Sequence, residues 1–380
     1  MAPRKIHVAH FTGSMIVGGV PTWLVHVFKH ADTTRFSFSL GIELRGGPLE
    51  SEVRQHGIEM FSIPRPLAIT LSPSNVMSEL VTRRPDIVHC YDTHSGPLLK
   101  AAARAGIAHR LVHIRVHRYL PTWLHPYRRL TMHLAWYWAR RYATRLLACS
   151  KWAAKGCLGE DWAEDPRITV LYNAIDLKPF THSNHHIGAQ LRADLSIPKG
   201  SVVIGHVGRL SEEKNHAFIL RLSPDILKAI PNAHIVFIGD GPLRSAIEAE
   251  VAKKGLASRI HLLGTRLDAP SLMLNFLDVL LFPSRSEGFG NVMLEAQAAG
   301  LPVVCATTIT DEAVVIPKMV QRLDLRAPAR DWIRAIRSAV ELRSRVDQES
   351  CLRTLMGSEF NMENSVRRLE AIYEEMMGSQ

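Results

Sequence analysis

Short apolar runs alternate along the chain with longer segments whose apolar residues recur at helical spacing. The clearest case lies at 279–304. Residues 279–282 form an apolar run that predicts a buried strand, the polar and glycine-rich stretch 283–290 predicts a loop, and a helical pattern begins at Asn291 and ends at Gly300. A strand, a glycine-rich loop and a helix N-terminus form the arrangement in which α/β proteins hold anionic ligands.

The same alternation repeats in both halves of the chain, with helical segments between the apolar runs. The predicted strands are 5–11, 36–42, 59–63, 86–90, 110–114, 146–150 and 168–171, then 202–207, 234–238, 260–263, 279–282 and 302–306. Strands that alternate with helices predict parallel, doubly wound sheets. The expected fold class is therefore α/β, with two Rossmann-like domains that face each other across a cleft.

The length of 380 residues exceeds what a single core normally holds. We expect an N-terminal domain at 1–180, a polar linker at 181–200, and a C-terminal domain at 201–358. A last helix at 359–380 is expected to pack back on the N-terminal domain.

The composition favours a cytoplasmic protein. No run of 18 apolar residues is present, and the N-terminus enters a strand without the apolar region of a signal peptide. The five cysteines show no CxxC spacing, which favours buried free thiols in a reducing compartment.

Positive charge is concentrated in one block. The formal net charge is +10, and twelve Lys or Arg residues lie between Asp92 and Glu160, where no acidic residue occurs. Within 115–145 the arginines interleave with Trp and Tyr. This pattern suits an anionic lipid surface, with arginines at phosphates and aromatic rings at the interface. An ordinary helix with solvated Arg and core Trp is the alternative; nucleic acid is not expected, because no nucleic-acid motif accompanies the block.

A second cationic feature follows the strand at 202–207. Gly208 and Arg209 come directly after it, and Lys214 lies five residues beyond Arg209. Two fixed cations beside a glycine suit a diphosphate, whose charge grows as it leaves. Two solvated surface cations are the alternative interpretation.

Two glutamates lie in the stretch at 279–304. Glu287 is in the glycine-rich loop and Glu295 is about one turn into the helix. Carboxylates accept hydrogen bonds from vicinal hydroxyls, which suits a ribose or a sugar. The alternatives are a glycosidase acid/base pair and, for Glu295, an ordinary surface residue; the apolar helix around Glu295 favours burial. A dinucleotide-binding oxidoreductase is disfavoured, because the first glycine turn lacks GxGxxG spacing.

Several motifs together resemble the retaining glycosyltransferases of family 4, which have the GT-B fold. They are the Gly18-Gly19 loop, GRLSEEKN, IGDGP, and an E-x7-E pattern within EGFGNVMLEAQAAGLPVV. The turn YNAIDLKPF is similar to the family's segment before the linker, although Tyr172 and Ala174 depart from it. The most similar subgroup is the bacterial exopolysaccharide and capsular polysaccharide enzymes.

The resemblance implies that the domain at 1–180 binds the acceptor and the domain at 201–358 binds the nucleotide sugar, and it implies roles for the site residues. Arg209 and Lys214 would hold the donor diphosphate, Glu295 the ribose and Glu287 the donor sugar. The other implied donor-site residues are Phe289, Gly290 and Asn291 at sugar and phosphate, Gly264, Thr265 and Arg266 beside the base, and Gly18 and Gly19 near phosphate or acceptor.

A histidine at an N-domain strand end is also implied beneath the donor sugar. Here His113 and His117 are both candidates, and His94 in the preceding loop is a third.

The resemblance implies a hexosyltransferase-type enzyme that needs no metal or cofactor. It would move a sugar, with retention, from a donor expected to be UDP-linked to a lipid-linked or oligosaccharide acceptor. The pathway would be exopolysaccharide, capsule or other cell-surface glycan synthesis, and residues 100–155 would bind the inner face of the cell membrane. The rival functions are a nucleotide-sugar epimerase or hydrolase of the same fold, and a non-catalytic membrane-associated assembly subunit.

Overall fold

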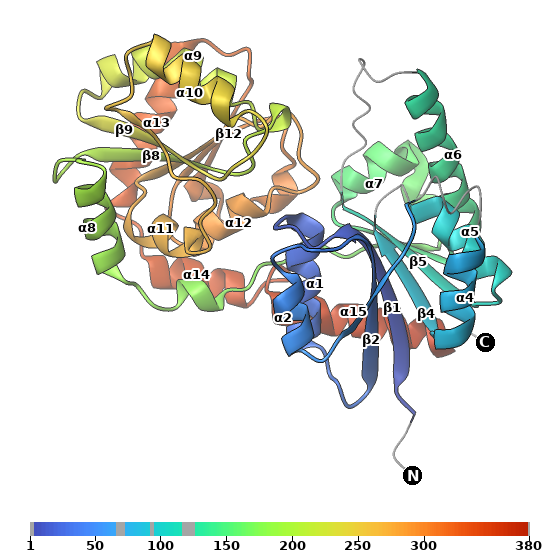
Figure 1. Ribbon diagram of the computed structural model, residues 1–380. Helices are drawn as coiled ribbons and strands as arrows, with labels where there is room; N and C mark the ends of the chain where they lie inside the picture. The colour runs from blue at the N-terminus through green and yellow to red at the C-terminus, as the bar shows by residue number, and fades with distance from the viewer. Residues whose placement is uncertain (1–3, 66–72, 92–94, 116–125, 379–380) are drawn as a thin grey trace. The chain divides into compact units, whose positions relative to one another are not determined.

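The computed structural model describes residues 4–65, 73–91, 95–115 and 126–378. The chain divides into two compact units: Met1–Asn173 with Met362–Gln380, and Ala174–Asn361. Figure 1 shows the C-terminal helix α15 (Met362–Gly378), drawn in red, within the first unit among the blue and green elements.

The first unit is built on a seven-stranded parallel sheet with the order β3-β2-β1-β4-β5-β6-β7. Its strands are β1 (Ile6–Ser14), β2 (Phe36–Leu44), β3 (Glu59–Ser62), β4 (Ile87–Tyr91), β5 (His109–Ile114), β6 (Arg145–Ala148) and β7 (Ile168–Val170). The register pairs Val8 with Phe38 on one side and with Ile87 on the other, so β1 lies at the centre of the sheet.

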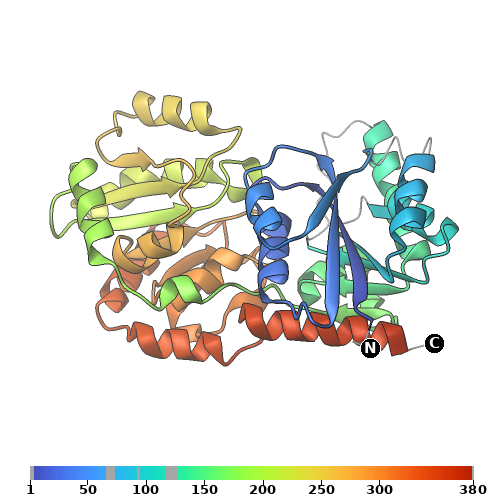
Figure 2. The same cartoon turned by 60° about the horizontal axis from the view of Figure 1, so that its bottom comes forward.

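Helices cover both faces of this sheet. They are α1 (Gly19–His30), α2 (Glu50–Gln55), α4 (Ser74–Arg83), α5 (Gly96–Arg104), α6 (Pro126–Tyr142), α7 (Lys151–Leu158), the 3-10 helix η2 (Glu160–Glu164) and α15. Helices α4, α5 and α6 pack side by side on one flank, whereas α1 packs against α2 and α15 on the other (Figures 1 and 2).

The second unit is built on a six-stranded parallel sheet with the order β10-β9-β8-β11-β12-β13. Its strands are β8 (Val202–Val207), β9 (Ala233–Ile238), β10 (Ile260–Leu262), β11 (Val279–Phe282), β12 (Val303–Ala306) and β13 (Val320–Leu323). Nearly all residues of β8, β9, β11 and β12 are buried, as parallel strands covered on both faces must be.

Two groups of helices cover the second sheet. The set comprises η3 (Lys178–Phe180), α8 (His185–Asp194), η4 (Glu212–Lys214), α9 (His216–Ala229), α10 (Arg244–Lys253), α11 (Ala269–Asn275), α12 (Asn291–Ala298), η5 (Asp311–Ala313), η6 (Pro317–Met319), α13 (Ala329–Arg343) and α14 (Gln348–Met356). Apolar side chains of α9, α10 and α13 form one core with the sheet. Helices α8, α11, α12 and α14 pack with one another.

The predicted doubly wound α/β class is confirmed, but the predicted linker is wrong in its structure. Residues 181–200 contain helix α8, which belongs to the second unit. The helix docks closely, because a Cβ at Gly188 would lie 2.2 Å from the carbonyl oxygen of Asn275, and Leu191 is buried. The sequence pattern did not indicate this helix, because most of its residues are polar and only a narrow row of its side chains packs against the second unit.

The chain leaves the second unit beside the point where it entered. Asn173 ends the first part of unit one, and Met362 begins its return. Within the second unit, the Ile175 amide donates to the Phe360 carbonyl at 3.0 Å, and Ile175 bridges Asn361. The unit boundary thus falls a few residues before the predicted end at 180.

None of the helices in the described residues is both long and apolar enough to span a membrane.

Candidate functional site

The strand order of the second sheet creates a switch point between β8 and β11. These strands pair in parallel, with Ile204 beside Val279 and Gly205 beside Leu280. The chain turns towards β9 after β8 and towards β12 after β11, so the loops at their carboxyl ends diverge. Open α/β sheets bind ligands in the crevice at such a point.

The loop after β8 is held in place by the glycine-containing loop that follows β9. The Leu210 amide donates to the Asp240 carbonyl at 3.0 Å, and the Leu243 amide donates to the Leu210 carbonyl at 3.0 Å. A Cβ at Gly241 would lie 2.5 Å from the Leu210 oxygen, so only glycine allows this close approach. The result is a fixed backbone that presents Arg209, whose side chain is exposed.

Lys214 and Glu287 are brought together from the two loops. The Nζ of Lys214 lies 2.6 Å from Oε1 of Glu287, and the side chains are 16% and 12% exposed. The loops are also joined through their backbones: the Arg285 amide donates to the Glu213 carbonyl at 2.7 Å, and the Asn215 amide group donates to the Pro283 carbonyl at 3.1 Å. Lys214, which is predicted to bind the diphosphate, and Glu287, which is predicted to bind the sugar, are therefore in direct contact.

The glycine-rich segment leads into helix α12. Gly290 has a φ of 92°, which is the left-handed region that favours glycine, and it precedes the first helical residue, Asn291. Phe289 is buried, and its ring stacks on Phe360 with centroids 5.6 Å apart. The buried ring fixes the loop, so the backbone around Gly290 has a defined position beside Glu287.

Glu295 lies one turn into α12 and is partly buried. Burial raises its pKa from the ordinary 4.5 to about 7, and the Lys214 charge opposes this rise. Glu295 is therefore near Lys214 as well, and it changes protonation close to neutral pH. The predicted alternative of an ordinary exposed residue does not fit this environment.

The predicted base-side loop follows β10. The Gly239 amide donates to the Gly264 carbonyl at 2.8 Å, which places this loop beside the one that holds Leu210. Thr265 is exposed. The guanidinium of Arg266 forms an ion pair with Asp268 at 2.6 Å, so part of its hydrogen-bonding capacity is already used.

Gly18 and Gly19 lie in the first unit, where β1 leads into α1. Both are exposed, and a Cβ at Gly19 would meet no atom within 4 Å. The open space leaves the start of α1 accessible to a ligand.

His113 is enclosed in the first unit rather than exposed at a site. It is 0% exposed, and its ring lies 5.9 Å from Trp23 in an edge-on contact and 5.7 Å from the rings of His89 and Tyr91. Burial, together with the charge of Arg115, holds the pKa of His113 well below its ordinary value. The role of His113 beneath the donor sugar stays a prediction; in this structure its ring is buried and contacts Trp23. The other candidates, His94 and His117, lie outside the described residues.

Sequence reasoning missed a buried polar cluster around His113. His10 shares a hydrogen bond of 2.9 Å with the Tyr91 hydroxyl, and His89 shares one of 2.7 Å with the Tyr373 hydroxyl. The second bond attaches α15 to the centre of the sheet. A polar residue inside each of two apolar strands, in HVAHF and IVHCY, was the available signal.

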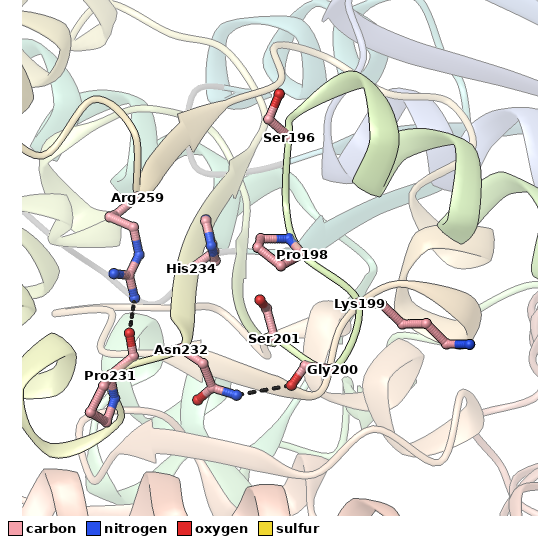
Figure 3. Close-up of a pocket in the computed structure, with 9 residues that line it drawn as sticks. All are labelled: Ser196, Pro198, Lys199, Gly200, Ser201, Pro231, Asn232, His234 and Arg259. Atoms are coloured by element: carbon pink, nitrogen blue, oxygen red, sulfur yellow. Dashed lines mark hydrogen bonds between the residues drawn. The ribbon is translucent and has the colours of Figure 1, made fainter.

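One cavity lies away from these residues, at the opposite edge of the second sheet (Figure 3). It has a volume of about 390 Å³ and is bordered by Lys199, Ser201, His234 and Arg259 near the amino ends of β8 and β9. The dashed lines in Figure 3 show its wall closed by hydrogen bonds from Arg259 to Pro231 and from Asn232 to Gly200. None of the predicted donor-site residues borders it, so we place the candidate site at the β8–β11 switch point instead.

Two family models match the chain. "Glycosyltransferase Family 4" matches residues 17–179, and "Glycosyl transferases group 1" matches residues 189–349. The chain is 29% identical to the putative glycosyltransferase EpsF of Bacillus subtilis over 389 aligned positions, which cover 98% of this chain and 97% of EpsF. It is 28% identical to the UDP-Gal:α-D-GlcNAc-diphosphoundecaprenol α-1,3-galactosyltransferase of Escherichia coli, with 79% of each chain covered.

Solved structures share the fold. HepE of Anabaena in complex with UDP has a TM-score of 0.78 at 19% identity and covers 98% of this chain and 100% of its own. A glycosyltransferase from Rickettsia africae has a TM-score of 0.80 at 16% identity and covers 100% of both chains. The two family models together match most of both units, and the residues of the switch-point site lie within the range matched by "Glycosyl transferases group 1". The chain belongs to glycosyltransferase family 4 and has the GT-B fold.

Proposed function

We propose that this glycosyltransferase moves a hexose from a UDP-linked donor, with retention, to a lipid-linked or oligosaccharide acceptor in cell-surface polysaccharide synthesis. One observation carries the proposal. Lys214 and Glu287 meet from two neighbouring loops at the β8–β11 switch point, Glu295 lies near Lys214 from helix α12, and Arg209 is presented by the first of these loops.

Each of the four side chains has a role that its chemistry fits. Arg209 and Lys214 bind the donor diphosphate, since fixed cations stabilise the negative charge that grows on the leaving group. Glu295 accepts hydrogen bonds from the ribose hydroxyls, and Glu287 accepts them from the sugar. The backbone around Gly290 completes the site.

The proposed chemistry uses the protein's own cations at the leaving diphosphate. The acceptor hydroxyl attacks the anomeric carbon on the face from which the diphosphate departs, so the configuration is retained. The departing phosphate oxygen takes the proton of that hydroxyl, and the new glycosidic bond replaces the sugar–phosphate bond. We therefore propose that turnover needs no metal ion.

The names of relatives support the donor and the acceptor. The Escherichia coli relative uses UDP-galactose and a diphosphoundecaprenol-linked sugar by its name, and HepE has UDP bound in its solved structure. For this chain we propose the same classes: a UDP-sugar, and a sugar on a lipid diphosphate.

A nucleotide-sugar screen tests the proposal. Thermal shift with UDP-, GDP-, ADP- and dTDP-sugars should show stabilisation by one UDP-sugar, because a ligand that binds only the folded state stabilises it. Transfer to a lipid-diphosphate sugar should follow with that donor, and NMR of the product should show the donor's anomeric configuration. Donor turnover that needs no acceptor would favour the epimerase or hydrolase alternative, and an inverted product would exclude retention.

We also propose that helix α6 binds an anionic membrane surface on its cytoplasmic side. Leu130, Leu134 and Tyr137 are 57%, 44% and 62% exposed at helical spacing, and Arg140 and Arg141 are exposed beyond them. Apolar side chains can enter the interface while the arginines bind lipid phosphates.

Co-sedimentation with vesicles tests this surface. The protein should bind vesicles that contain anionic lipid at low salt and bind neutral vesicles weakly. Leu134→Ser with Tyr137→Ser should weaken binding, whereas Leu267→Ser, at an 84% exposed leucine of the second unit, should not. Equal sedimentation of both variants would contradict the assignment to α6.

A further inference from the structure

His206 is a buried histidine in β8, immediately beneath the candidate site. It is 1% exposed, and its Nδ1 lies 2.9 Å from the carbonyl oxygen of Leu281. A carbonyl oxygen can only accept, so Nδ1 carries the hydrogen and donates it. Burial, together with the charges of His216 and Lys214, holds the pKa of His206 well below its ordinary value. The ring is therefore neutral, and Nε2 retains a lone pair.

That lone pair has no hydrogen-bond partner among the described residues, although Nε2 is buried. A buried acceptor without a partner is costly, so a native structure that retains one needs a reason for it. The surrounding rings do not supply a hydrogen-bond partner. The ring centroids of Phe237 and Phe282 lie 6.1 and 5.9 Å from that of His206, and the ring of His216 stands nearly perpendicular to it at 4.6 Å.

The space above Gly208 connects this nitrogen with Lys214. A Cβ at Gly208 would lie 3.7 Å from Nε2 of His206 and 3.4 Å from Cε of Lys214. The lysine chain and the imidazole thus border the same small gap, which the missing side chain of Gly208 leaves open. The ammonium itself lies 2.6 Å from Oε1 of Glu287.

We propose that His206 is a positioning residue for Lys214: its Nε2 accepts a hydrogen bond from the ammonium when a donor sugar engages Glu287. This rests on the proposed function, because it assumes that Lys214 acts on the donor diphosphate. An ammonium has three N–H donors. If one N–H group of Lys214 donates to His206, the other two can donate to phosphate oxygens. The neutral ring adds no competing positive charge.

Charged and titratable side chains surround both Lys214 and His206. Lys214 faces Glu287 from the loop after β11 and Glu295 from α12, and His206 faces His216 from α9 and Lys214 from η4. A hydrogen bond accepted from an ammonium fixes its position among these charges. Loss of the His206 acceptor should therefore lower kcat more than it weakens donor binding.

Three substitutions at one position separate this role from packing. His206→Phe keeps the ring without polar atoms, His206→Asn keeps a polar group near Nδ1, and His206→Gln keeps one near Nε2. Phe and Asn should lower kcat roughly 10-fold, as expected for one hydrogen bond to a charged group, with a smaller change in donor KM. Gln should restore part of kcat. His234→Phe, at the amino end of β9, is the matched control and should leave kcat and donor KM unchanged.

A double-mutant cycle decides the outcome. In a Lys214→Ala background, His206→Phe should cause no further loss, because the two residues would act as one unit. A folded His206→Phe enzyme with wild-type kcat would overturn the proposal. If the Phe variant does not fold, equal kcat values for Asn and Gln would overturn it. If Lys214→Ala itself leaves transfer unchanged, the proposed function fails rather than this inference alone.

Discussion

Lys214 and Glu287, which are 73 positions apart in the sequence, form an ion pair of 2.6 Å across the two loops of the candidate site. Each is one of the groups that we assign to the donor, one to its diphosphate and one to its sugar. In this structure the two charges compensate each other. We therefore expect a donor that engages both side chains to compete with this ion pair.

Removal of either cation should lower turnover more than donor affinity. Arg209→Ala and Lys214→Ala are each expected to reduce kcat roughly 100- to 1,000-fold, because they lose charge stabilisation that grows in the transition state. Steady-state kinetics with varied donor measures the split between kcat and KM. Lys228→Ala, at an exposed lysine of α9, is the control and should behave as wild type. Equal, small losses in kcat and affinity would contradict the assignment.

Glu295 should make both donor affinity and stability depend on pH. Its pKa of about 7 lies above the ordinary 4.5, so the folded protein holds this proton more tightly than the unfolded chain does. The resulting stability is complete below about pH 4.5 and is lost as pH rises through 7. Glu295→Gln should flatten this fall in the melting temperature between those values.

Donor affinity should change in the opposite direction. The ionised carboxylate is the stronger acceptor for ribose hydroxyls, so affinity should rise as pH passes through 7 in the wild type. Calorimetry with a nucleotide sugar measures it. The Glu295→Gln enzyme should show weaker and nearly pH-independent binding; an unchanged pH dependence would place the titrating group elsewhere.

Gly241 should matter for the donor without touching it. In Gly241→Ala the new Cβ would meet backbone atoms of Leu210 at 2.5 and 2.8 Å, so the loop that carries Arg209 has to shift. We expect a rise in donor Kd with the fold intact. Gly357→Ala, at the end of α14, is the control, since its nearest atoms would lie 3.8 Å away. Wild-type affinity in Gly241→Ala would show that the loop adapts.

Tyr373→Phe should destabilise the first unit. The substitution removes the hydroxyl that lies 2.7 Å from Nδ1 of His89, and both residues are 0% exposed. A buried polar atom left without its partner costs about 1–3 kcal/mol. Denaturant unfolding measures the loss, with Tyr137→Phe at an exposed tyrosine as control. A neutral result would mean that His89 finds another partner or water.

The local chemistry of the second unit could be predicted from the sequence. Apolar runs followed by glycine-rich, polar segments indicate strand ends, and Arg209, Lys214, Glu287 and Glu295 occupy such segments or the helix after one. These signals are short-range, so periodicity and residue type suffice to find them. The alternation of strands and helices likewise predicted the doubly wound class.

The first unit shows where such reasoning stops. His113 lies at a predicted strand end, yet its side chain is buried and its ring contacts Trp23 from α1. Helix α8 has a mostly polar surface, and the sequence pattern there predicts a linker instead. In both cases the outcome depends on which distant element covers a given face, and no local pattern records this.

The sequence by itself determined the residue types, the strand–loop–helix order and the family motifs, because each is written within a few neighbouring positions. Only the tertiary structure decided that Lys214 pairs with Glu287, that Glu295 is buried enough to titrate near pH 7, and that Nε2 of His206 opens onto the gap at Gly208. Those relationships arise from strand order, since β8 and β11 become neighbours only when the sheet forms. Burial and long-range charge contacts are properties of that packing rather than of any local pattern.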